Sequence, residues 1–249
     1  MDPISLFKQK NFSNTSWWRL KKNISGFQSA TGNDLLTEIF ENRLFRLVEL
    51  NLQNNDWVIK KRILIQLYED GYICWINLND LIIEESNFPY ISAELKDESF
   101  IRTQITSILD WIKEQSRIPN IYLWGGTTGP NYDCSGLIQT AFLKHNIFIP
   151  RDSFQLKNFC SILFETTPDI DLLMKGDILF FGSNDQCDHV GIYIDKGFYY
   201  HSSGIKFGRN GIGIDNLIYP NNLISIYYKS KFISAGRIKR SYRWDRTLR

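Results

Sequence analysis

One cysteine in this sequence combines a residue type and a local setting that suit nucleophilic chemistry. Cys134 lies between a glycine-rich loop, residues 125–130, and an apolar helical pattern that starts just after it. The first turn of a helix stabilises a thiolate or an oxyanion through its unpaired N–H groups and the positive end of its dipole. The position of Cys134 therefore predicts a nucleophile, with a buried structural thiol as the alternative.

The chain has only three histidines, and two of them flank one predicted β-hairpin. His189 opens a strand pattern over residues 189–195, His201 lies near the end of the next at residues 198–202, and residues 195–197 have the composition of a turn. With a three-residue loop, side-chain alternation puts both imidazoles on one face, whereas a two-residue loop needs a bulge to do so. One imidazole would then accept the thiol proton while the other orients it.

Zinc binding is an alternative use of the same side chains. Cys187 could join Cys134 and the two imidazoles as zinc ligands, but the spacing matches no compact structural zinc pattern. We therefore predict neither a metal nor another cofactor. The third histidine, His145, follows the end of the helix that Cys134 starts, where a positive charge is favourable. Cys160 and Cys187 have no imidazole pattern of their own and are interpreted as structural.

The elements that must position these residues fall into two groups along the chain. Residues 24–85 carry short strand patterns between turn signals, which is typical of a small β-barrel. Residues 101–112 place isoleucines at helical spacing, and Pro119 ends that helix. Besides the hairpin, strand patterns occur at residues 177–181 and 225–235. The sequence thus predicts an α+β fold: a small barrel followed by an α+β unit.

Composition and charge exclude several classes of protein. The 249 residues are 43% hydrophobic and 14% aromatic, which excludes wholesale disorder. A net charge of +2 is too small for a nucleic-acid clamp. No window has the roughly 18 apolar residues of a membrane span, and residues 1–27 lack the apolar run of a secretory signal. We therefore predict a cytoplasmic protein with reduced cysteines and with no nucleic-acid or membrane partner, and the oligomeric state stays open.

Five successive motifs resemble those of the NlpC family, papain-like cysteine peptidases that cut the peptide stems of bacterial cell wall. The motifs are Tyr-Leu-Trp-Gly-Gly-Thr (122–127), Asp-Cys-Ser-Gly-Leu (133–137), Gly-Asp-Ile-Leu-Phe-Phe (176–181), His-Val-Gly-Ile-Tyr (189–193) and His-Ser-Ser-Gly (201–204). The resemblance covers residues 101–235. Residues 24–83 are similar to the bacterial SH3-like domain that often precedes such catalytic domains, although Cys74 stands where a glycine is usual.

Pattern and resemblance together divide the chain into five segments. The segments are an N-terminal arm with a short helix around Trp17 and Trp18 (1–23), an SH3-like barrel (24–85), a linker (86–100), an NlpC-type, papain-like α+β catalytic domain (101–236) and a solvated basic tail (237–249).

The resemblance also implies a role for each member of the site. Cys134 would be the nucleophile, His189 the general base and His201 the polar third member, with Tyr122 helping the oxyanion site. The reference pKa of histidine, about 6.5, then predicts a bell-shaped pH profile with one limb near neutrality.

The subgroup that joins an SH3-like domain to this unit implies a substrate. Such enzymes are γ-D-glutamyl–diamino acid endopeptidases that need a free N-terminal L-alanine, and they act in cell-wall turnover and recycling. By resemblance, Asp152 and Ser153 would read the alanine amine. Four further residues would line the neighbouring subsite or wall the end of the pocket: Asp133, Ser135 and Trp124 for the subsite, and Tyr72 for the wall. The partner would be a small murein peptide, and the sequence does not identify its diamino acid.

Alternatives stay open for both residues and function. Asp152 could simply cap a helix, Tyr72 could pack in the barrel, and Trp124 could belong to the core. The chain could instead be a secreted or lytic hydrolase of intact murein, a cell-wall-binding module without catalysis, or an acyl-transfer enzyme that uses the same thiol.

Overall fold

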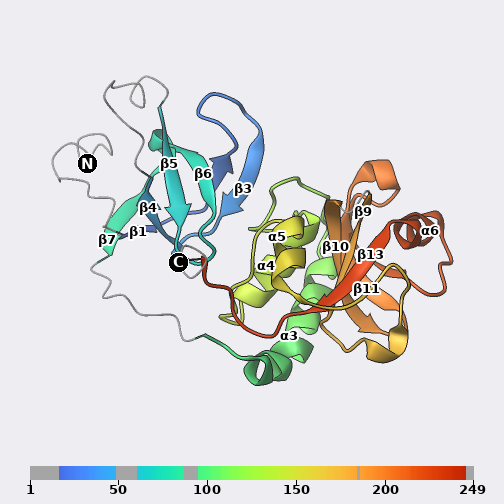
Figure 1. Ribbon diagram of the computed structural model, residues 1–249. Coiled ribbons are helices and arrows are strands. Elements are labelled where there is room, and N and C mark those ends of the chain that lie inside the picture. The colour runs from blue at the N-terminus through green and yellow to red at the C-terminus, as the bar shows by residue number, and fades with distance from the viewer. Residues whose placement is uncertain (1–16, 49–60, 87–94, 184–185, 245–249) are drawn as a thin grey trace. The chain divides into compact units, whose positions relative to one another are not determined.

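The computed structural model describes residues 17–48, 61–86, 95–183 and 186–244. The chain divides into two compact units (Figure 1). The first unit comprises residues 1–93 and 243–249, and the second comprises residues 94–242. Among the described residues, no helix has both the length and the apolar character needed to cross a bilayer.

The first unit is a seven-stranded antiparallel sheet with an apolar core on one face. Its strands pair in the order β3-β2-β6-β5-β4-β1-β7. The elements are β1 (Trp17–Leu20), β2 (Ile24–Phe27), β3 (Leu35–Ile39), β4 (Leu44–Leu47), β5 (Arg62–Leu67), β6 (Ile73–Asn77), the 3-10 helix η1 (Leu78–Asp80) and β7 (Ile83–Ser86).

The barrel predicted for residues 24–85 is not observed. Within the described residues, no pairing joins the edge strands β3 and β7, so the sheet stays open. The helix predicted around Trp17 and Trp18 is wrong as well, because these residues form β1, which pairs with β4 and β7. The Trp18 ring is 2% exposed and supplies core to this sheet. Burial on one face has therefore made a strand of a segment whose sequence shows no clear period.

The first unit also takes in residues from the far end of the chain. Trp244 donates its indole N–H to the Tyr68 carbonyl at 2.8 Å and packs its ring against Gly71. The Arg46 guanidinium lies 5.1 Å from the centroid of the same ring. The chain from residue 237 onward therefore differs from the predicted solvated tail: Arg237 ends a strand and Trp244 is packed, while residues 245–249 lie outside the described residues.

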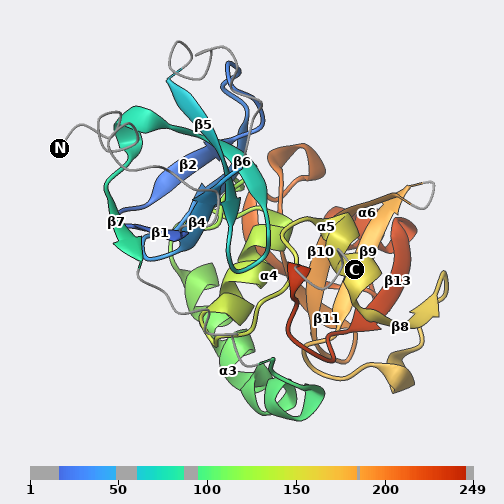
Figure 2. The same ribbon diagram turned by 60° about the vertical axis from the view of Figure 1, so that its left-hand side comes forward.

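The second unit is built on a six-stranded antiparallel sheet ordered β12-β11-β10-β9-β13-β8. Figures 1 and 2 show helices on both sides of this sheet. The strands are β8 (Ser161–Glu165), β9 (Ile178–Ser183), β10 (Gln186–Asp195), β11 (Phe198–Ser203), β12 (Gly211–Asn216) and β13 (Phe232–Arg237). The helices are α3 (Glu98–Arg117), α4 (Cys134–Leu143), α5 (Ser153–Phe159), α6 (Leu223–Ser230) and the 3-10 turns η2 (Ile170–Leu172) and η3 (Ile205–Phe207).

The two faces of this sheet have separate cores. Phe180 joins the core beneath α3, α4 and α5, whereas its neighbour Phe181 joins the core that contains Tyr228 of α6. Successive side chains of a strand point to opposite faces, so β9 and β10 supply both cores at once. Both predicted helices, at residues 101–112 and after Cys134, are confirmed as α3 and α4.

One predicted strand is partly wrong. Residues 225–235 contain all but the first two residues of α6 and then the start of β13. Asn222 caps α6 by accepting a hydrogen bond from the Ser225 N–H at 2.8 Å. Tyr228 lies on the buried side of that helix. The local capping and the apolar face thus override the β-branched and aromatic composition of the segment.

Candidate active site

Cys134 is the first residue of α4, which packs closely against the glycine-rich loop. The Asp133 side chain caps this helix, accepting the Gly136 N–H at 2.6 Å and, through its other oxygen, the Gly125 N–H at 2.8 Å. A side chain at Gly136 would meet the carbonyl oxygen of Gly126. Only glycine therefore lets the start of α4 lie this close to the loop.

A buried arginine holds the same end of the helix. Arg151 donates to both oxygens of Asp133, at 3.1 and 2.6 Å, and to the Ser135 hydroxyl at 2.9 Å. Both Asp133 and Ser135 were predicted to line a substrate subsite. The structure uses their polar atoms within the protein, where they fix the helix that carries Cys134.

The Cys134 thiol is neutral in this setting. Burial raises its pKa to about 12, and the Asp133 carboxylate acts in the same direction. Hydrogen bonds from the backbone of Val190 and Ser135 and the charge of Arg151 lower the pKa but do not outweigh burial. Within the described chain no hydrogen bond joins this thiol to the His189 imidazole. Instead, the contact with Val190, the residue after His189, sets the thiol beside β10.

Two imidazoles meet across the hairpin of β10 and β11. Its turn has two residues, Lys196 and Gly197, with φ of 49° and 85°. A bulge between residues 193 and 195 restores the alternation that a two-residue turn would break. His189 Nε2 consequently lies 2.8 Å from His201 Nδ1, and both side chains are buried.

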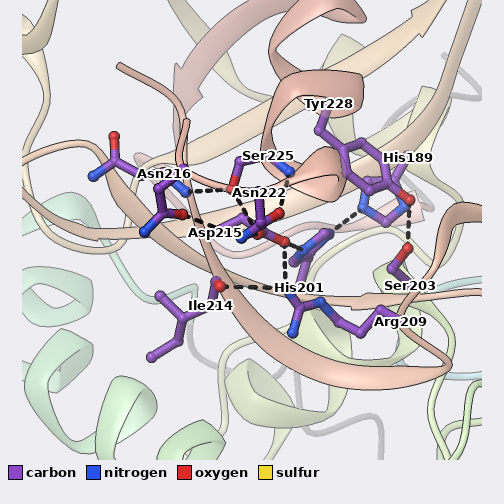
Figure 3. A network of polar contacts seen from close by, with 11 residues as sticks. His189, His201, Ser203, Arg209, Ile214, Asp215, Asn216, Asn222, Ser225 and Tyr228 are labelled. Atoms are coloured by element: carbon purple, nitrogen blue, oxygen red, sulfur yellow. Dashed lines mark hydrogen bonds and ion pairs between the residues drawn. The ribbon is translucent and has the colours of Figure 1, made fainter. Parts of the chain in front are cut away.

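A carboxylate on the next strand extends this contact. His201 Nε2 lies 2.7 Å from Asp215 Oδ2, and Arg209 donates to the same oxygen at 2.7 Å. The other oxygen of Asp215 accepts from the Ser225 hydroxyl at 2.7 Å and from the Asn222 amide at 3.1 Å. Figure 3 shows the resulting network from imidazole to guanidinium.

Tyr228 of α6 covers the imidazole pair. Its ring stacks on His189 with centroids 4.3 Å apart and meets His201 edge-on at 4.8 Å (Figure 3). Its hydroxyl lies 2.7 Å from the Ser203 hydroxyl. Burial raises the pKa of Tyr122 and Tyr228, and both lie close enough to Cys134 for the charge of its thiolate form to raise their pKa further. The cysteine and the imidazoles therefore share a lining of two tyrosines.

Both imidazoles are neutral near neutral pH. Burial lowers the pKa of His189 well below 6.5, His201 lowers it further, and Asp215 opposes the shift. Burial also lowers the pKa of His201, although its hydrogen bond to Asp215 acts against this. A neutral His189 has a lone pair with which to accept a proton.

Sequence reasoning did not identify Asp215, Arg209 or Tyr228. Asp215 lies in β12, a strand that the glycines of residues 211–213 conceal, and Tyr228 lies in the segment predicted as a strand. The signal for Tyr228 was Asn222, a good N-cap residue ahead of an apolar run. For Asp215 the only local signal was the isoleucine alternation in β12.

An open cavity of about 390 Å³ adjoins His189. Tyr122, Trp124 and Tyr228 line it, and Cys134, which is 5% exposed, is not among its lining residues. Trp124 is 66% exposed, so the core role considered for it is wrong. Charged groups also border the cavity: Asp188, Lys206 and Lys231. A peptide carrying both ammonium and carboxylate groups would find partners of either sign.

The residues predicted to bind the substrate amine lie at the start of α5. Asp152 occupies the N-cap position but makes no capping hydrogen bond, and Ser153 donates to the Cys187 carbonyl at 3.0 Å. Capping therefore does not explain the Asp152 carboxylate. Tyr72 lies in the first unit, packed against its apolar core. Among the described residues, nowhere do three or more His, Cys, Asp or Glu side chains gather as a metal site would require.

Comparison with known proteins bears on the second unit. Residues 120–235 match the model of the NlpC/P60 family. The chain is 41% identical over 86 residues to a γ-D-glutamyl-L-lysine dipeptidyl-peptidase of Bacillus cereus, covering 32% of this chain and 24% of the relative. It is 35% identical over 102 residues to dipeptidyl-peptidase 6 of Lysinibacillus sphaericus, covering 41% of this chain and 33% of that protein. These alignments span about a quarter and a third of the relatives' own lengths.

A solved structure gives a weaker likeness. The crystal structure of an NlpC/P60 family protein from Bacillus cereus is similar with a TM-score of 0.43 and 22% identity, covering 92% of this chain and 65% of that chain.

Proposed function

We propose, from the match of residues 120–235 to the NlpC/P60 family model, that the protein is a cysteine peptidase of murein peptides. The bond cleaved would be that between γ-D-glutamate and a diamino acid, in peptides with a free N-terminal L-alanine. The name of the Bacillus cereus relative supports the γ-D-glutamyl bond as the target. Turnover of small peptides in the cytoplasm and an SH3-like character of the first unit are parts of the same proposal.

The observation that carries the proposal is a helix-start cysteine bound to the backbone of the residue after His189, a neutral histidine that a second histidine orients. Cys134 lies at the first turn of α4, and its thiol receives the N–H of Val190, the neighbour of His189. His189 in turn contacts His201 at 2.8 Å. This is the order of nucleophile, base and orienting group that acyl transfer requires.

The chemistry follows from the protonation states. The thiol is neutral at rest, so its proton passes to His189 as the sulfur attacks the carbonyl carbon. The oxyanion that forms would be stabilised by N–H groups at the start of α4 and by Tyr122. His189 then gives its proton to the leaving amine, which releases the diamino acid and leaves a thioester on Cys134. Water, activated by His189, hydrolyses the thioester and restores the thiol.

Substrate selection would depend on the start of α5. A cationic α-amine binds best to a carboxylate in a partly desolvated site, and Asp152 supplies a carboxylate at the start of α5. We therefore propose that Asp152 and Ser153 read the free alanine amine. Trp124, which is exposed and lines the cavity beside His189, keeps its proposed place around the remainder of the peptide.

The test is hydrolysis of defined peptides followed by mass spectrometry. The full chain is incubated with L-Ala-γ-D-Glu-L-Lys, with the diaminopimelate analogue, with the N-acetylated tripeptide and with intact sacculi. Release of the free diamino acid from unblocked tripeptides, with at least about tenfold slower cleavage after acetylation, is the expected result. Solubilised sacculi with untouched tripeptide would instead favour a lytic enzyme.

The matched control uses another cysteine of the same domain. Cys160 is also a free, buried thiol, and burial raises its pKa too. Cys134→Ala should abolish hydrolysis, whereas Cys160→Ala should leave most of it. Equal activity in Cys134→Ala and the parent would exclude a nucleophilic thiol at this position.

A further inference from the structure

We propose that Asp215 is a positioning residue that selects which nitrogen of His189 acts as the base, operating through His201. The inference rests on the proposed function for its kinetic consequence. Its structural content, the proton position on two imidazoles, stands apart from any substrate.

Asp215 is held as a permanent anion. Its side chain is fully buried, and it accepts hydrogen bonds from Arg209, Ser225 and Asn222 in addition to its contact with His201. Burial alone would raise the pKa of Asp215, but the hydrogen bonds from His201 and Ser225 and the charge of Arg209 hold the pKa well below its usual range. An ionised carboxylate only accepts hydrogen bonds.

That anion fixes the tautomer of the adjacent imidazole. His201 Nε2, 2.7 Å from Asp215 Oδ2, must carry the hydrogen of this contact. Because burial keeps His201 neutral, its Nδ1 then holds a lone pair and accepts. The partner of that lone pair, 2.8 Å away, is His189 Nε2, which must therefore be the N–H donor.

These two hydrogen bonds, between Asp215 and His201 and between His201 and His189, determine which nitrogen of His189 has a lone pair. With its hydrogen on Nε2, neutral His189 has a bare Nδ1, and this nitrogen becomes the base. The three residues lie on three adjacent strands, β10, β11 and β12, as Figure 3 shows for the side chains. Arg209 is thus connected to the ring of the reacting nitrogen by three hydrogen bonds in series, through Asp215 and His201.

Other groups face these imidazoles and enter the pH dependence. They are Tyr199 on β11, Tyr228 on α6, Asp188 beside His189 on β10, Arg209 before β12, and Cys134 and Tyr122 on the side of α4. The charge of Asp215 raises the pKa of both His189 and His201.

The first test reads the proton positions directly. Long-range ¹H–¹⁵N spectra of the full chain, labelled at histidine and recorded at about pH 7.5, distinguish the protonated from the bare nitrogen of each ring. The expected result is an Nε2–H tautomer for both His189 and His201, assigned with His189→Gln and His201→Gln. Nδ1–H on His189, or a doubly protonated His201, would overturn the proposal even if the protein proved to be a peptidase.

The second test removes the charge while keeping the shape. Asp215→Asn can donate as well as accept, so the His201 tautomer is no longer fixed. We expect kcat to fall at least about tenfold with KM within about twofold, since losing the orienting carboxylate of a Ser-His-Asp triad costs on the order of 10⁴ and Asp215 is one residue further away. The acid limb of kcat/KM should also move to lower pH, because the charge that raises both imidazole pKa values is gone.

A second buried carboxylate provides the matched control. Asp177 is equally buried and binds Arg237 through two contacts of 2.8 Å, yet it touches no imidazole. Asp177→Asn should destabilise the domain as Asp215→Asn does but leave the acid limb and the histidine spectra in place. If both variants changed the pH profile in the same way, Asp215 would have only a structural role and the proposal would be wrong. Absence of peptidase activity with the expected tautomers would refute the proposed function and not this relay.

Discussion

At the scale of single residues, location and not acidity distinguishes the proposed nucleophile. Burial raises the pKa of Cys74 and Cys134 to about 12 and that of Cys187 to about 11. The thiol of Cys134 is therefore no more acidic than its structural counterparts. What sets it apart is its place at the first turn of α4, beside β10. Reactivity then depends on a base that takes the proton during attack, in place of a thiolate formed in advance.

Alkylation of Cys134 should follow its thiolate fraction. With a pKa near 12, the thiolate increases about tenfold for each pH unit between 7 and 9, and the rate with iodoacetamide should increase with it. Peptide mapping by mass spectrometry separates the four cysteines and gives each rate. A plateau already reached below pH 7 would show a preformed thiolate–imidazolium pair and contradict this prediction.

The acid limb of peptidase activity should lie below pH 6.5. The active base is neutral His189, and its pKa is lowered, so protonation inactivates it only at a pH below the reference value. The limb near neutrality that the sequence predicts from an unperturbed histidine is thereby displaced. The measurement is kcat/KM of the unblocked tripeptide from about pH 4 to 8. A limb at or above pH 6.5 would mean that burial does not control this imidazole.

At the scale of elements, helices with a clear period and a cap were predictable. The isoleucine spacing of α3 and the start of α4 at Cys134 followed from sequence alone, and so did a turn near residues 195–197. The contact between the two imidazoles needed the bulge in β10, which no local pattern reveals. β12 and α6 were not predicted, because glycines and β-branched residues obscure their periods. Asp215 in β12 and Tyr228 in α6 were therefore not identified either. These residues are set by tertiary packing.

Replacing Asp133 by asparagine should destabilise the start of α4. Asparagine still caps a helix but leaves the buried Arg151 without its anionic partner, which costs about 3–5 kcal/mol when a buried pair is broken. Hydrogen exchange of the α4 amides measures the loss. Asp97→Asn at the exposed cap of α3 is the control and should cost no more than about 1 kcal/mol. Equal losses in the two helices would show that Arg151 is not stabilised by Asp133.

At the scale of the whole molecule, the two units differ in how the chain builds them. The second unit is one continuous stretch, residues 94–242, whereas the first draws on both ends of the chain. Trp244 supplies an indole hydrogen bond and a packed ring to strands that begin more than 170 residues earlier, since it lies 176 residues from Tyr68. The stability of the first unit therefore depends on residues that lie far along the chain from its strands.

Truncation after residue 242 should weaken the first unit alone. It removes the Trp244 hydrogen bond and the ring contact with Arg46, together about 1–3 kcal/mol. Exchange protection should fall in β4 and β5 and stay unchanged in α3 and α4. Truncation after residue 244 is the matched control and should change neither. Loss of protection in α4 would show that the two units unfold together.

The bulged hairpin of β10 and β11 has one more consequence: catalytic activity depends on the correct register between these two strands. A slip of one residue between β10 and β11 would reverse the facing of every side chain on the slipped strand, so that Tyr200 would occupy the position of His201. Such a chain would still be compact, with most of its apolar surface covered. It would nonetheless be inactive, so a sample containing such molecules would show a lower specific activity.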